Sequence, residues 1–199
     1  KYTMTLLHLS DTHGLHRQIE NLPLADVIVH TGDFCEKSTV EEVEDFVEWF
    51  ALLPHKHKIF VAGNHDDCLH GAAIEGLPDG VHYLCHSGIE IDGVNFYGLP
   101  MFVADELSGD YEKAISRIPS DTDVLITHQP SYGILDFTEG VHYGNVSLLS
   151  RVLCIKPRLH LFGHVHKANG KLEAHDTLYV NGSLVSGMKI AYTPQLIHL

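Results

Sequence analysis

The sequence has few cysteines, no long apolar run and little positive charge. Its four cysteines, Cys35, Cys68, Cys85 and Cys154, show no Cys-x-x-Cys spacing, which argues against a zinc ribbon or a thioredoxin-type motif. Free thiols in a reducing cytosol are the simplest interpretation, so we expect a cytoplasmic protein. No apolar run reaches the ~18 residues that span a bilayer. The amino end leads straight into a predicted strand, so no signal peptide is visible, although one could have been removed.

The scarcity of positive charge limits the partners that the chain can have. Lys and Arg number 13 against 26 Asp and Glu, a net charge of −13, which argues against a nucleic-acid or anionic-membrane partner. A small phosphate substrate stays compatible, because bound metal ions would dominate the local field. No linker, repeat or low-complexity stretch interrupts the 199 residues, so we expect a single domain over 1–199.

What the sequence does contain is one pattern repeated five times, in which an apolar run ends at metal-type residues. The central example is the run 59–62, which stops at Gly63 and is followed by Asn64, His65 and Asp66. The other runs lead into Asp11 and His13, into Gly32 and Asp33, into His128, and into Gly163, His164 and His166. Polar side chains crowded at such turns are costly to bury unless an ion or ligand satisfies them. Five strand ends of this kind predict one site along one edge of a sheet.

The first third of the chain alternates strand and helix signals. Strands are expected at 4–10, 26–30 and 58–62, with a short helical stretch at 15–21. Ser38 or Thr39 can cap a longer helix that reaches Leu53, with apolar residues at spacings of three, four and seven. Strands joined by helices predict right-handed crossovers and a parallel sheet.

The rest of the chain reads as shorter elements. Residues 66–80 are expected to be irregular, followed by strands at 81–84, 88–91 and 94–97, the last two joined at Asp92-Gly93. Helices are expected at 110–118 and from Asn145 to about 155, strands at 123–127 and 158–162, and a loop at 129–144. The tail, 171–199, reads as an antiparallel meander that turns at Asn181-Gly182. Two facing sheets with helices outside would bury both kinds of strand.

The residues at the strand ends indicate metal chemistry. The candidate ligands are seven: Asp11, His13, Asp33, Asn64, His128, His164 and His166. Carboxylates, imidazoles and an amide suit divalent Mn, Fe, Co or Zn. Seven side chains are too many for one ion but suit two that share a carboxylate, spaced ~3.5–4 Å as in two-metal phosphate sites. Such a centre would attract a phosphate and supply hydroxide as nucleophile, and His65 could donate a proton to the leaving oxygen.

These residues carry a resemblance to a known family. Asp11-x-His13, Gly32-Asp33, Gly63-Asn64-His65-Asp66, His128 and Gly163-His164-x-His166 resemble all five motifs of the calcineurin-like metallophosphoesterases, in order and spacing. Flanking residues, such as Phe46-x-x-Trp49-Phe50 and the run from Lys156 to Gly163, are similar to the small branch that includes the metallophosphoesterase-domain cyclic-nucleotide phosphodiesterases. That branch sometimes has Gly where this chain keeps His164.

The resemblance implies a fold and an assignment of roles. The fold is α/β, a four-layer α/β/β/α sandwich of two mixed sheets flanked by helices. Asp11, His13, Asp33 and His166 would hold one metal, and Asp33, Asn64, His128 and His164 the other, with Asp33 bridging. His65 matches the catalytic histidine of the family.

We therefore expect a binuclear metal-dependent phosphoesterase, with Mn, Fe or Zn as candidate ions. Its substrate would be a small phosphodiester or phosphomonoester, with cyclic nucleotides among the candidates, because the compact chain shows no basic groove for DNA or RNA. The alternative is a non-catalytic docking module of the same fold. The presence of His65 and of a full ligand set favours the enzyme.

Several other residues have weaker expectations. His8 and His30 lie within strands and are expected in the core, whereas His55 and His57 are expected at the surface. Asp66 is given no chemical role. The sequence leaves open whether His16 lines the pocket, and whether Glu36 orients His65 or belongs to an exposed loop. The same choice between pocket wall and plain surface stays open for four loop residues: His70, Tyr132, His142 and Tyr143.

Overall fold

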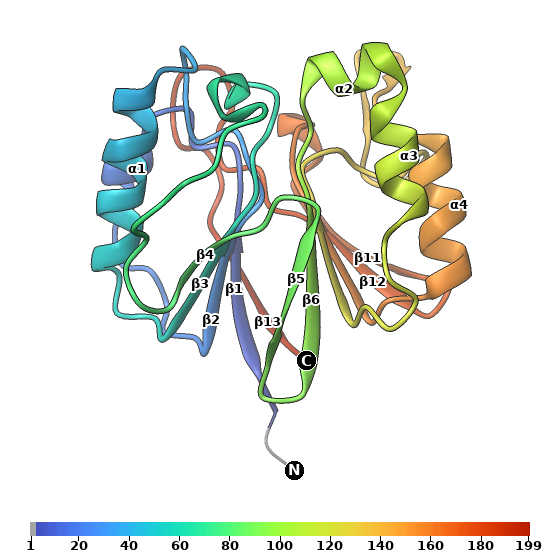
Figure 1. The fold of residues 1–199 in the computed structure, drawn as a ribbon, viewed down its shortest axis with the longest axis horizontal. Coiled ribbons are helices and arrows are strands. Elements are labelled where there is room, and N and C mark those ends of the chain that lie inside the picture. The colour runs from blue at the N-terminus through green and yellow to red at the C-terminus, as the bar shows by residue number, and fades with distance from the viewer. Residues whose placement is uncertain (1–2) are drawn as a thin grey trace.

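The computed structural model describes residues 3–199 and contains two large mixed sheets (Figure 1). The first sheet has the order β13-β1-β2-β3-β4, in which β1 to β4 run parallel and β13 is antiparallel to β1. Its strands are Gln195–His198 (β13), Thr5–Leu9 (β1), Val27–His30 (β2), His57–Phe60 (β3) and Val81–Tyr83 (β4).

The second sheet has the order β11-β12-β10-β7-β6-β5. Its strands are Gly170–Ala174 (β11), Thr177–Asn181 (β12), Leu159–Phe162 (β10), Val124–Thr127 (β7), Val94–Leu99 (β6) and Ser87–Ile91 (β5). The four inner strands run parallel, and the edge strands β11 and β5 are antiparallel to their neighbours. A separate small hairpin pairs β8 (Phe137–Thr138) with β9 (Val141–His142).

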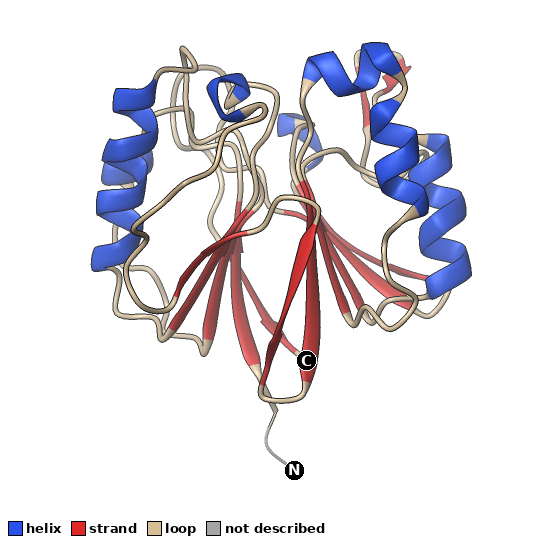
Figure 2. Cartoon of the chain, viewed as in Figure 1, coloured by secondary structure: helices blue, strands red, loops and turns tan. Residues whose placement is uncertain are grey.

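Helices lie outside both sheets, as Figure 2 shows. Helix α1 (Val40–Leu52) covers the first sheet, and α3 (Asp110–Ser116) and α4 (Val146–Ile155) cover the second. The other helical segments are short: α2 (Val103–Ser108) and the 3-10 turns η1 (His16–Gln18), η2 (Asp67–Leu69) and η3 (His166–Ala168). The predicted α/β/β/α sandwich is therefore confirmed. In the described residues, no helix combines the length and the apolar character that crossing a membrane requires.

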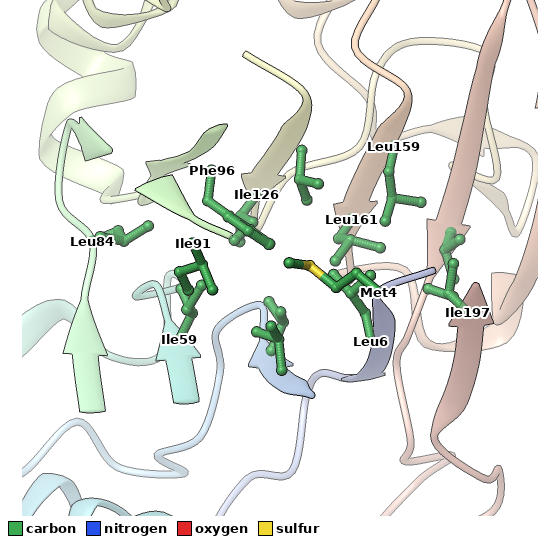
Figure 3. Close-up of a cluster of buried hydrophobic side chains, with 14 of the residues drawn as sticks. Met4, Leu6, Ile59, Leu84, Ile91, Phe96, Ile126, Leu159, Leu161 and Ile197 are labelled. Carbon is green, nitrogen blue, oxygen red and sulfur yellow. The ribbon is translucent and has the colours of Figure 1, made fainter. Parts of the chain in front are cut away.

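The alternation of side chains along the strands builds three apolar cores. Leu6 points between the sheets, whereas its neighbour Leu7 packs in the core shared with α1. The central core joins residues of both sheets, including Ile59, Ile126 and Leu161 (Figure 3). Burying both faces of each sheet explains why the inner strands are apolar almost throughout, as parallel strands are.

Helix α1 shows how local sequence sets this packing. Thr39 caps it by accepting from the backbone N–H of Glu42, and the Glu42 side chain accepts from the backbone N–H of Thr39. Phe46 and Phe50 are fully buried against the first sheet. The predicted cap is confirmed, and so is the apolar face except for Val40, which is 60% exposed at the start of the helix.

The predictions were wrong for segments whose conformation depends on turn residues or on pairing with distant strands. The stretch 15–21 forms only the 3-10 turn η1, and both α2 and the β8–β9 hairpin were missed. The predicted turn at Asn181-Gly182 is wrong, because Asn181 ends β12 and the turn falls at His175 and Asp176, both with positive φ. The tail is also not one meander, since β13 crosses to the first sheet.

The parallel strands bring their carboxyl ends to one edge of the sandwich. Strand β1 rises from the amino terminus at the bottom of Figure 1, so the strands parallel to it in its sheet end toward the top. The two sheets meet there, because the backbone N–H of Ser10 donates to the carbonyl of Gly182 at 2.9 Å. The segments after β1, β2, β3, β7 and β10 contain the residues expected to form the site.

Candidate metal centre

Six of the seven expected ligands come together although they are spread over more than 150 positions of the sequence. Two groups of three each place one ligand atom per residue within 4.8 Å of the others: Asp11, His13 and His166, and Asp33, His128 and His164. A third group, His13, Asp33 and His65, shares His13 with the first and Asp33 with the second. The five strand ends therefore form one cluster.

The first group is built around His166. Its Nε2 lies 3.3 Å from Oδ1 of Asp11 and 3.2 Å from Nε2 of His13. Nε2 of His13 in turn lies 3.8 Å from Oδ2 of Asp33. Four side chains from three different strand ends thus direct donor atoms to one small volume.

The second group contains Asp33, which also lies near His13 of the first group. Nε2 of His128 lies 3.3 Å from Oδ2 of Asp33 and 3.2 Å from Nδ1 of His164. Nδ1 of His128 lies 2.8 Å from the carbonyl oxygen of Thr31, to which it can only donate, so Nε2 is the ring nitrogen that faces the cluster. Oδ2 of Asp33 thus lies near one histidine of each group, His13 and His128.

Asn64 supplies an independent sign that the cluster fits a cation. Its Oδ1 atom is buried and has no hydrogen-bond partner among the described residues. A buried amide oxygen without a partner is costly, and a hard or borderline divalent cation would satisfy it. An amide oxygen, two carboxylates and four imidazoles make a donor set of the kind that binds divalent metal ions.

The electrostatics of the cluster also favour positive charge. Burial alone would lower the pKa of His128, but the carboxylates of Asp33 and Asp11 outweigh it and raise that pKa to about 10. Burial opposes ionisation of Asp33 and Asp11, yet neighbouring histidines hold both pKa values below their usual range. The same field that attracts a proton to His128 attracts a metal cation.

The backbone at the strand ends is held in an uncommon conformation. Asp11, His13, Asp33 and His164 all have positive φ, at 52°, 42°, 55° and 70°. Non-glycine residues reach this left-handed region at a cost, which surrounding contacts must offset. A Cβ at Gly63 would overlap the carboxylate of Asp33, so that position accepts only glycine.

Asp66 provides contacts that hold these loops. Its carboxylate is fully buried and accepts from the backbone N–H groups of Asp33 at 2.8 Å, Gly63 at 2.8 Å and Cys35 at 2.9 Å. Burial, with the nearby charge of Asp33, raises the pKa of Asp66 to about 7. Asp66 was expected to cap or support its neighbours and to take no part in the chemistry, and the structure shows that it supports them by connecting the second strand end to the third.

Hydrogen bonds from residues near the C-terminal end of the sequence orient the Asp11 side chain. Ser183 donates its hydroxyl to Oδ2 of Asp11 at 2.7 Å, and the backbone N–H of His164 donates to the same oxygen at 3.0 Å. The Asn181 side chain donates to the carbonyl of Val165 at 3.1 Å, which fixes the loop that contains His164 and His166. Ser183 was not expected at the site, and the one local signal is that Gly182 and Ser183 directly follow the strand β12.

His65 sits beside the cluster and is exposed. Its backbone N–H donates to Oδ1 of Asp33 at 2.8 Å, and its ring centroid lies 4.7 Å from that of His13. Nδ1 of His65 lies 3.2 Å from the carbonyl oxygen of Glu36. That contact makes Nδ1 the donor and leaves Nε2 available to another partner.

Two grooves open beside the cluster and share His166. One, of about 420 Å³, is lined by His13, Leu15, Glu36, His65, His166, Val185, Gly187 and Met188. The other, of about 230 Å³, is lined by Thr138, Glu139, Tyr143, His164, Val165, His166 and Lys167. A molecule that reaches the cluster can therefore extend to either side of it.

The family model of the calcineurin-like phosphoesterases matches residues 4–168, which include every expected ligand. The chain belongs to this family. Membership supports a metal-dependent phosphoesterase and agrees with the donor clusters.

Relatives within the family have similar sequences. The chain is 34% identical to UPF0046 protein K07C11.7 of Caenorhabditis elegans, over 88% of this chain and 68% of that protein. It is 32% identical to human metallophosphoesterase domain-containing protein 1, over 88% of this chain and 64% of the human protein. The chain thus spans about two thirds of the length of these relatives, and the second name matches the branch that the flanking residues indicated.

Solved structures with low sequence identity share the fold. The protein TT1561 of Thermus thermophilus superposes with a TM-score of 0.59 at 13% identity, over 90% of this chain and 89% of that one. GAP50, described as the anchor in the inner membrane complex of Plasmodium, gives 0.59 at 14% identity, over 98% and 77%. At such identities the likeness concerns the fold alone.

The structure also shows where the histidines with weaker predictions lie. His8 and His30 are fully buried, as expected for core residues. The surface assignment of His55 is wrong, because it is 2% exposed and its Nε2 lies 2.9 Å from the carbonyl oxygen of Pro23; His57 is partly exposed. His16 is buried against Asp45, at 2.8 Å, and lines neither groove.

The four loop residues that the sequence assigned neither to the pocket nor to the surface fall into two kinds. Tyr143 lines the smaller groove, with its ring centroid 6.2 Å from that of His164. Tyr132 and His142 contact each other instead, with centroids 4.9 Å apart, and His70 lies 3.0 Å from Asp105. The backbone carbonyl of Glu36, not its carboxylate, contacts the His65 ring.

Proposed function

We propose that this chain is a binuclear metal-dependent phosphoesterase that hydrolyses a small phosphodiester or phosphomonoester. The observation that carries the proposal is the position of Asp33, whose Oδ2 lies 3.3 Å from His128 and 3.8 Å from His13, one residue in each donor group. A carboxylate between two donor groups suits a pair of ions better than one.

The proposed assignment divides the seven residues between two sites. Asp11, His13, Asp33 and His166 would hold one ion, and Asp33, Asn64, His128 and His164 the other. Two divalent ions bound there would neutralise phosphate charge and lower the pKa of a coordinated water toward 7. The chain's own contribution is to fix the donors in advance, through Asp66, Ser183 and the Thr31 carbonyl.

His65 is the proposed catalytic side chain. It is exposed in the larger groove, beside His13 and His166, and its Nδ1 is occupied by the Glu36 carbonyl. Nε2 is then the atom that would donate a proton or hydrogen bond to the leaving oxygen. A leaving group in this position would occupy the larger groove.

The grooves favour a small substrate. Volumes of about 420 and 230 Å³ suit a nucleotide-sized molecule. The net charge of −13 gives no support to a nucleic-acid polymer. Cyclic nucleotides are the first compounds to test, because the flanking residues resemble those of cyclic-nucleotide phosphodiesterases.

The test is a substrate panel on protein stripped of metal and reloaded with Mn. It pairs bis-p-nitrophenyl phosphate with p-nitrophenyl phosphate, and 2′,3′- with 3′,5′-cyclic nucleotides. Turnover that EDTA abolishes supports the proposal, and the ratio of diester to monoester rates identifies the ester class. No turnover of any ester with two ions bound per chain would instead indicate the docking module.

A further inference from the structure

The larger groove has an uneven lining. Leu15 and Met188 supply apolar surface, with Met188 90% exposed, whereas Val185 is almost fully buried beneath the groove. His13, His65 and His166 line its inner end. A group that leaves toward His65 would therefore contact hydrocarbon on one side and imidazoles on the other.

Glu36 is the acidic residue of this groove. Among the described residues that line it, none is Lys or Arg, so nothing in the lining pairs with a second anionic group. The Glu36 side chain is 49% exposed, and its Oε2 lies 3.4 Å from Nδ1 of His13. Because the Glu36 backbone carbonyl makes the contact with His65, the carboxylate is not used to orient that ring.

The smaller groove differs in charge. Lys167 and Glu139 both line it, and they form an ion pair at 2.8 Å that offsets their charges. Tyr143, 43% exposed, adds an aromatic ring there. The two sides of the cluster thus offer different environments to the two halves of an ester.

We propose that Glu36 determines leaving-group specificity: the larger groove takes an uncharged, partly apolar alcohol or phenol and rejects one that has a second anionic group. This inference rests on the proposed function, in which His65 assists the leaving oxygen. The Glu36 carboxylate lies in the groove through which that group departs, so a second anion on the leaving group would meet a like charge that no Lys or Arg of the lining offsets.

The expected change in rate follows from the distance between the Glu36 carboxylate and a second anionic group of the leaving group. Two like charges a few ångströms apart at a partly exposed site change a rate by about five- to tenfold. E36Q keeps the shape of the side chain and removes its charge, and E36K reverses the charge. We expect E36Q to remove the discrimination and E36K to invert it.

The experiment uses two phenylphosphonate monoesters, each with a single cleavable P–O bond. Their leaving groups are 4-hydroxybenzamide and 4-hydroxybenzoate, which have nearly the same shape and differ by one negative charge. Values of kcat/KM for the Mn-reloaded protein are divided by the rate constants of alkaline hydrolysis, which corrects for intrinsic reactivity. The wild type should prefer the benzamide ester by about fivefold or more.

E90Q is the matched control. Glu90 is exposed and pairs with Asn95 in the β5–β6 hairpin, outside both grooves, so E90Q removes one charge without touching the site. It should keep the wild-type ratio, whereas E36Q should bring the ratio close to one. The change should arise from faster reaction of the charged ester.

Each other outcome overturns the inference in a distinguishable way. If both esters are cleaved but E36Q leaves their ratio unchanged, the specificity role is wrong and the phosphoesterase function stands. An equal fall in both rates would mean that Glu36 only orients His13. If the reloaded wild type cleaves neither of these esters nor any in the substrate panel, the proposed function fails, and the inference fails with it.

Discussion

The buried carboxylate of Asp66 accepts a hydrogen bond from the backbone N–H of Asp33 at 2.8 Å. Asp33 has a φ of 55°, in a region that a non-glycine residue occupies at a cost. Two hydrogen bonds hold Asp33 in place between the two donor groups. Its backbone N–H donates to Asp66, and its Oδ1 accepts from the backbone N–H of His65. The position of the shared side chain is thus set by neighbours that touch no substrate.

Replacement of Asp66 should damage both stability and metal binding. Asp66→Ala leaves three buried backbone N–H groups without their acceptor, and we expect a loss of about 3 kcal/mol or more in the free energy of unfolding. Urea unfolding of the metal-free protein measures this loss. Asp66→Asn retains one acceptor oxygen and should lose less. A metal-free alanine variant as stable as the wild type would contradict this role.

Replacement of Asp33 should disturb both ions at once. Asp33→Asn removes the negative charge that the two donor groups share, so the metal content of purified protein should fall at both sites together. Elemental analysis gives the number of ions per chain, and the ester assay gives the activity. One ion still fully bound with normal turnover would contradict a bridging Asp33.

The variant His65→Ala should separate chemistry from metal binding. The His65 side chain is exposed and contributes its backbone N–H, not its ring, to Asp33. We therefore expect unchanged metal content and a loss of about 10²–10⁴-fold in kcat on esters with poor leaving groups. Esters of p-nitrophenol need less help from an acid and should lose much less. Loss of metal from this variant would refute the role in leaving-group protonation.

The main elements and the expected ligands could be predicted because each depends on local sequence. The apolar runs that become β1, β2, β3, β7 and β10 are unambiguous, and the polar residues after them include all members of the two donor groups. The capping box of α1 is likewise a local signal.

What the sequence did not reveal depends on contacts between distant segments. Ser183 reaches Asp11 across 172 positions, and nothing near Ser183 indicates that partner. Asn181-Gly182 has the composition of a hairpin turn, yet Asn181 continues β12 because the strand pairs with β10. His55 lies in a polar stretch but is buried by its contact with the Pro23 carbonyl. In each of these three examples, a contact with a segment distant in the sequence determines the structure.

Acid should destabilise the protein through its buried histidines, and His160 offers a clean test. Burial, with a smaller effect of His8, lowers the pKa of His160 from 6.5 to about 3. In the unfolded chain, His160 therefore takes up a proton below pH 6.5. In the folded chain, it does so only at about pH 3. Stability falls as pH drops through that window, by about 1.4 kcal/mol per pH unit for one such group.

His160→Gln should flatten this dependence. Glutamine does not titrate and can keep a hydrogen bond to the Thr127 hydroxyl, which lies 2.9 Å from Nε2 of His160. Between pH 7.5 and 5, the metal-free variant should lose about 2 kcal/mol less stability than the wild type. His175→Gln, at an exposed turn, is the control and should leave the wild-type slope unchanged. Equal slopes for His160→Gln and the wild type would contradict this prediction.

The most direct test of the account is a titration of the metal-free protein with Mn, in which bound ions and turnover of bis-p-nitrophenyl phosphate are measured together. We predict no turnover without metal, two ions bound per chain at saturation, and activity that appears as the second site fills. Turnover that persists in EDTA would contradict a metal-dependent phosphoesterase. Full binding of two ions without hydrolysis of any ester would show that the centre is not catalytic.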